Sequence, residues 1–143
     1  MSLRKSFLYS IMAFCLVGIG YGQGTKDLKK YFNDMALRVD AASTPLEKRE
    51  ILTNSFSTMI QALDIVRQMP LIPQGDRKAI SRFESSIRDK QNELLGLAGH
   101  TRVSDEQLSA FAHFTVQDTE QAEMITISLV TLLLIIIIVI LLV

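Results

Sequence analysis

The clearest helical pattern in the chain is TPLEKREILTNSFSTMIQALDIVRQMPLIP, residues 44–73. It starts with a capping box, because the Thr44 side chain can accept from the Glu47 amide while the Glu47 side chain reaches back, and Pro45 stands at the first helical position. The pattern ends at Pro70. Between these ends, apolar side chains recur at alternating spacings of four and three residues, which places them on one face of a helix: Leu52, Phe56, Met59, Leu63 and Val66.

Three more stretches between the two ends of the chain have the same periodicity. The first runs from Thr25 to Ala42, and the third helix is expected to begin with Asp76 as its N-cap and to end near Ala98. The fourth helix begins at a second capping box, Ser104 to Gln107, whose acidic residues suit the positive end of a helix dipole. Its apolar side is expected to contain Leu108, Phe111, Ala112 and Thr115.

These patterns predict an all-α fold, a small antiparallel helical bundle of about four helices, because each apolar face must be covered and short loops make neighbouring helices run in opposite directions. No stretch has the alternating pattern of a strand. The same spacing also fits a long hairpin of the second and third helices, with the first and fourth packing in an oligomer. A homo-oligomer therefore stays open at this point.

Residues 1–22 have the three parts of a secretory signal peptide. Arg4 and Lys5 precede an apolar run from Phe7 to Ile19, and small residues, Gly20 and Gly22, stand where a signal peptidase needs them. We expect cleavage after residue 22. The alternative is an uncleaved membrane anchor, but the apolar run is short of the roughly 20 residues that cross a bilayer.

The C-terminal segment, residues 124–143, is predicted to be a single transmembrane helix. From Ile125 onward it reads ITISLVTLLLIIIIVILLV, without a charged residue. A helix that is apolar on every face is typical of a membrane span rather than of the core of so small a domain. Two alternatives stay open: a signal for attachment of a lipid anchor, and the tail anchor of a cytosolic protein.

Three polar residues interrupt the apolar C-terminal segment: Thr126, Ser128 and Thr131. Their hydroxyl groups are candidates for contacts with another helix in the membrane, although bonds back to carbonyls of their own helix are the more ordinary arrangement. The remaining isoleucine and leucine side chains form a smooth lipid-facing surface.

The signal peptide and the terminal span together predict that residues 23–122 form a helical domain on the extracytoplasmic side of the cell membrane, periplasmic or extracellular. The flank that precedes the span, residues 103–123, contains acidic but no basic residues, which suits a translocated segment. Residues 23–102 contain thirteen basic and ten acidic residues. This excess is too small to indicate a nucleic-acid partner.

Side chains that carry chemistry are scarce, so we expect no catalytic, cofactor or metal site and no enzymatic activity. His100 falls in a turn, and the residues one helical turn from His113 include no metal ligand. The one cysteine, Cys15, lies inside the leader. No phosphate-binding glycine loop or nucleophile elbow is present.

The leading hypothesis from the sequence is a non-enzymatic, single-pass membrane protein of the cell envelope, acting as an interaction, structural or accessory component for another envelope or membrane protein. The alternative hypothesis is a sensor or carrier that binds a small ligand between its helices. Four side chains are candidates for such a pocket, although residues of this kind more often belong to an ordinary core: Phe56, Met59, Phe83 and Phe111.

Overall fold

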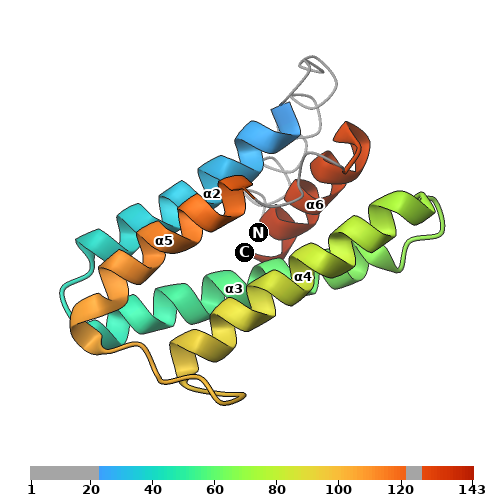
Figure 1. The fold of residues 1–143 in the computed structure, drawn as a ribbon. Helices are drawn as coiled ribbons and strands as arrows, with labels where there is room; N and C mark the ends of the chain where they lie inside the picture. Colours follow the sequence, from blue (N-terminus) through green and yellow to red (C-terminus); the bar gives the residue numbers. More distant parts are fainter. Residues whose placement is uncertain (1–22, 122–126) are drawn as a thin grey trace.

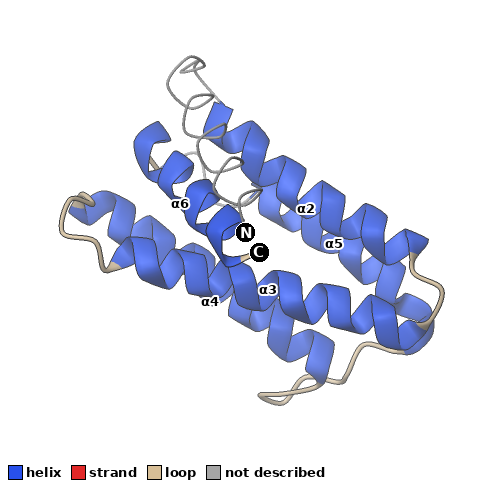
Figure 2. Cartoon of the chain, turned by 180° about the vertical axis from the view of Figure 1, so that it is seen from behind, coloured by secondary structure: helices blue, strands red, loops and turns tan. Residues whose placement is uncertain are grey.

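The computed structural model describes residues 23–121 and 127–143. The predicted signal peptide, residues 1–22, and the candidate contact residue Thr126 lie outside the described residues. Within those two ranges the structure is all α-helical without a strand, so the predicted helical bundle is confirmed (Figures 1 and 2). Its elements are α2 (Gln23–Ala41), α3 (Pro45–Arg67), α4 (Gln74–Leu95), the 3-10 helix η1 (Asp105–Gln107), α5 (Leu108–Gln121) and α6 (Leu129–Leu142).

Helix α3 begins as its capping box predicts. The Thr44 hydroxyl oxygen accepts a hydrogen bond from the Glu47 amide at 3.2 Å, and Pro45 occupies the first position of the helix. The Glu47 carboxylate reaches back one residue further than expected and accepts from the Ser43 amide at 3.2 Å. One orphan amide of the helix, that of Glu47, and the amide of the preceding Ser43 are thereby satisfied, which stabilises the start of the central helix.

Two of the predicted caps are wrong. Helix α4 starts at Gln74, directly after Pro73, so Asp76 lies inside its first turn instead of capping it. Ser104 makes no side-chain capping bond, and the chain passes through η1 before α5 begins at Leu108. In both cases a polar residue near a helix start matches the local capping pattern without making the capping bond. The Asp76 carboxylate instead accepts hydrogen bonds from residues far away along the chain.

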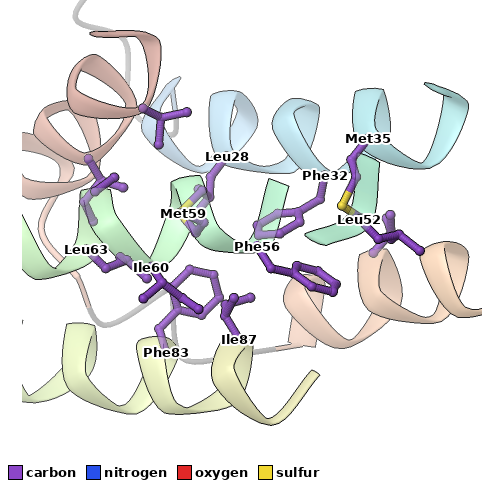
Figure 3. Close-up of a cluster of buried hydrophobic side chains, with 14 of the residues drawn as sticks. Leu28, Phe32, Met35, Leu52, Phe56, Met59, Ile60, Leu63, Phe83 and Ile87 are labelled. Carbon is purple, nitrogen blue, oxygen red and sulfur yellow. The ribbon is translucent and has the colours of Figure 1, made fainter. Parts of the chain in front are cut away.

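Helix α3 is the central element, because it contacts α2, α4, α5 and α6. Helices α2 and α5 lie side by side on one part of it, and α4 folds back along another part (Figures 1 and 2). The first and fourth predicted helices thus pack within the same chain, which supports the bundle over the hairpin oligomer. Side chains of α2, α3 and α4 meet in one continuous apolar core (Figure 3).

The C-terminal segment differs most from its prediction. The structure does not confirm a continuous membrane helix over residues 124–143. Helix α6 begins at Leu129 and contains 14 residues. It packs against α2 and α3, with Leu132, Ile135 and Val139 buried. Such a helix is about 21 Å long, whereas the hydrocarbon core of a bilayer is about 30 Å thick. Among the described helices, none combines the length and the apolar character that a membrane span requires.

Candidate functional site

The start of α6 is held by a polar cluster in which two of the three residues, Asp76 and Thr131, are buried. Ser128 is the N-cap residue of the helix, and its hydroxyl oxygen accepts from the Thr131 amide at 3.4 Å. The hydroxyl groups of Ser128 and Thr131 both point at the carboxylate of Asp76, which lies in the first turn of α4. These three residues, Asp76, Ser128 and Thr131, are called the Asp76 cluster below.

The hydrogen bonds of the Asp76 cluster are short and converge on one carboxylate. Ser128 and Thr131 each donate a hydroxyl hydrogen to Asp76 Oδ2 at 2.7 Å, and the Ser128 amide donates to Asp76 Oδ1 at 3.2 Å. Asp76 is only 6% exposed. Within the described part of the chain, no basic side chain forms an ion pair with it. The donors of α6 therefore take the place of a counter-ion.

The position of Asp76 also brings its charge near two helix N-termini. It lies in the first turn of α4, and it faces the first residues of α6. Amide dipoles at the start of a helix favour a negative charge. Burial raises the pKa of the carboxyl group, but the hydrogen bonds from the Ser128 hydroxyl, the Thr131 hydroxyl and the Ser128 amide outweigh it and hold the pKa below its usual 3.8.

Beyond its buried stripe, α6 has exposed apolar side chains at both ends, while those between are partly buried. The exposed side chains on it include Val130 at 69% and, at the C-terminal end, an uninterrupted run from Ile140 to Val143. Scattered exposed apolar side chains are normal on a protein surface, but adjacent ones on a single uncharged helix are unusual. Helix α6 is therefore apolar all round, and the bundle covers its middle more completely than its ends.

Two of the three residues proposed to contact another helix in the membrane have a partner within the bundle, and the membrane contact itself stays a prediction. Ser128 and Thr131 bond to Asp76 of α4 in the same chain, whereas the sequence suggested a second membrane helix. Sequence reasoning gave Asp76 only a capping role. The available signal is an acidic residue and a hydroxyl pair one turn apart, but 52 residues separate Asp76 from Ser128, so no local pattern joins them.

The four candidate pocket residues all lie in the core. Phe56 and Met59 of α3 are fully buried, and Phe83 of α4 and Phe111 of α5 nearly so. Phe56 packs edge-on against Phe111 with ring centroids 6.3 Å apart, and Phe83 packs in the same way against Phe32 of α2 at 6.3 Å. These contacts give each ring a packing role, and ligand binding between them stays a prediction.

The histidines occupy surface positions. His113 of α5 is exposed, and its Nε2 lies 2.7 Å from Asp40 Oδ2 of α2, where the pair ties two neighbouring helices together. His100 lies in the exposed loop that follows α4. In the described ranges no group of histidine, cysteine or acidic side chains is arranged to hold a metal ion.

Comparison of this chain with known protein families, with curated proteins and with solved structures finds no match. The functional argument therefore depends on the geometry of α6 and the Asp76 cluster.

The lowered pKa of Asp76 predicts a particular dependence of stability on pH. Because the folded-state pKa lies below 3.8, the anion stabilises the fold at every pH above that value, and this stabilisation is lost as the pH falls through the lowered pKa. Asp76→Asn is therefore expected to lower the free energy of unfolding by about 1–2 kcal/mol at neutral pH, and the difference should shrink towards zero in acid.

Urea denaturation of the wild-type chain and the variant at a series of pH values would measure this difference. Asp89→Asn, an exposed position of the same helix, is the matched control and should leave the free energy of unfolding unchanged. Equal stability of wild type and Asp76→Asn at neutral pH would contradict the assigned role of the carboxylate.

Proposed function

We propose that this protein is a non-enzymatic membrane-anchored interaction protein of the cell envelope, whose C-terminal segment is the anchor and whose helical bundle is the partner-binding part. The observation that carries the proposal is the set of exposed apolar side chains at the two ends of α6, Val130 and residues 140–143, on a helix whose other side chains, Thr131 apart, are also apolar. No charged residue occurs in residues 124–143. A lipid phase solvates such a segment on all sides, whereas water does not.

The composition of the chain supports the placement of the bundle outside the cytoplasm. The leader pattern in residues 1–22 directs export, and residues 103–123 lack the basic residues that favour retention on the cytoplasmic side. The bundle itself offers many solvated polar residues and a packed core, which suits binding by surface complementarity to another envelope or membrane protein. Catalysis is not part of the proposal, because the residues that the structure describes offer no cluster of reactive side chains in support of it.

The anchor is tested by expressing the full chain and extracting isolated membranes with alkaline carbonate. We expect the wild-type chain to stay in the membrane pellet. The double variant Ile140→Glu and Leu141→Glu alters two exposed positions of α6, so it leaves the packing of the bundle intact while adding charges that cost about 2 kcal/mol or more each inside a bilayer. Its membrane-retained fraction should fall at least about tenfold, since every 1.4 kcal/mol corresponds to a factor of ten.

The control is Leu71→Glu, which introduces the same charge at an exposed apolar position between α3 and α4. All three chains have the same leader, so any difference between them reports on α6. Complete extraction of the wild-type chain by carbonate, or equal retention of all three chains, would contradict the proposed anchor.

A further inference from the structure

Helix α6 is bound to the bundle by an apolar contact and by one polar cluster, and these two respond differently to a membrane. The surface of α2 and α3 that α6 contacts is called the docking surface below. We propose that the docking surface holds the chain's own anchor segment in water, and that the Asp76 cluster is the latch that must open before α6 enters a bilayer. This inference rests on the proposed function, because it assumes that α6 reaches lipid.

The apolar part of the contact does not by itself keep α6 on the bundle. Leu132, Ile135 and Val139 are buried against the docking surface. Lipid chains are as apolar as leucine side chains, so these residues lose little when they exchange protein neighbours for lipid. Transfer also covers the apolar side chains at the ends of α6 that are exposed in the docked arrangement. Apolar contacts alone therefore favour the bilayer.

The polar part of the contact favours the docked arrangement. Three hydrogen bonds join the start of α6 to Asp76, and all are lost when the helix leaves. Thr131 is fully buried, and outside the cluster its hydroxyl can bond only to a carbonyl of its own helix or to water. The strength of the Asp76 cluster accordingly sets the population of docked α6.

The rest of the bundle has its own contacts, so it does not need α6 to hold α2 and α3 together. The Tyr31 hydroxyl of α2 donates to the Ser55 carbonyl of α3 at 2.7 Å, and Arg38 donates to the Ser55 hydroxyl at 3.3 Å. The ring contact between Phe56 and Phe111 joins α3 to α5. Helices α2 to α5 can thus remain packed while α6 detaches.

Detachment of α6 has a consequence for binding. Leu28 of α2 and Met59 and Leu63 of α3 are fully buried, and they lie at the end of the core towards α6 (Figure 3). Release of α6 would uncover apolar side chains of this region in the membrane-anchored form alone. The same step that anchors the protein therefore changes the surface that it offers to a partner.

The latch is tested first in water by hydrogen exchange of the purified full chain, read separately for peptides of α6 and of α3. Two variants weaken the cluster from opposite sides: Asp76→Asn in α4 and Thr131→Val in α6, the second of which removes only a hydroxyl and keeps the shape of the side chain. Each should make the α6 amides exchange about tenfold faster while those of α3 stay protected, because local opening becomes more frequent. Asp89→Asn should match the wild type.

The second measurement mixes the same proteins with phosphatidylcholine vesicles and separates bound from free chain by flotation. The vesicle-bound fraction should rise about fivefold or more for Asp76→Asn and Thr131→Val, because opening precedes insertion. Unchanged exchange of α6 in both variants would overturn the latch. Faster exchange with equal flotation of every chain would also overturn it, while the anchor stands; absence of flotation in every chain would overturn the anchor and, with it, this inference.

Discussion

The substitution Phe56→Ala is expected to lower the free energy of unfolding of the bundle by about 3–5 kcal/mol. Phe56 is fully buried at the centre of α3, the helix that contacts all the other described α-helices, and its ring packs edge-on against that of Phe111. Truncation to alanine removes the ring from the core and leaves a cavity that the neighbouring helices cannot close. The cost combines the lost apolar transfer energy with the energy of that cavity.

Chemical denaturation followed by circular dichroism would measure the effect of Phe56→Ala. Phe114→Ala is the matched control, because Phe114 lies on α5 and is 63% exposed. This second variant should change the free energy of unfolding by no more than about 0.5 kcal/mol. Similar losses in the two variants would mean that α5 does not pack on α3 as described here.

The substitution Arg49→Met is expected to destabilise the chain by about 2–4 kcal/mol, because it leaves buried carbonyl groups without a donor. Arg49 of α3 is only 8% exposed. Its guanidinium group donates to the Leu94 carbonyl at 2.9 Å, to the Val103 carbonyl at 2.8 Å and to Asp105 Oδ1 at 2.9 Å. One side chain thus joins the end of α4, the following loop and η1 to the central helix.

The effect of Arg49→Met is best resolved by combining urea denaturation with hydrogen exchange. Protection should fall most in residues 96–107, whose attachment depends on the guanidinium group, and least in α2, which accepts none of its three hydrogen bonds. Arg102→Met changes an exposed arginine of the same loop and serves as the control. A variant of Arg49 that keeps both wild-type stability and loop protection would show that the two carbonyls find water in its place.

Local sequence patterns were sufficient for most of the bundle. Leu52, Phe56 and Met59, identified by their spacing alone, are all fully buried, because three- and four-residue spacing places side chains on one helix face whatever the neighbouring helices are. The Thr44 cap was equally predictable, since donor and acceptor lie within one turn. The roles of Asp76 and Arg49 were not, because their partners lie far away along the chain.

Helical state and the inward side of each helix in residues 23–121 therefore follow from the amino-acid sequence, since they depend on neighbours within about one turn. The location of the C-terminal segment is a different kind of property. The hydropathy of residues 124–143 favours a membrane span, but a protein core and a lipid phase are both apolar, so hydropathy alone does not show that α6 also packs on the bundle. Only the tertiary structure decides where α6 lies. It provides a docking surface on α2 and α3, and a carboxylate on α4 that accepts three hydrogen bonds from the start of α6.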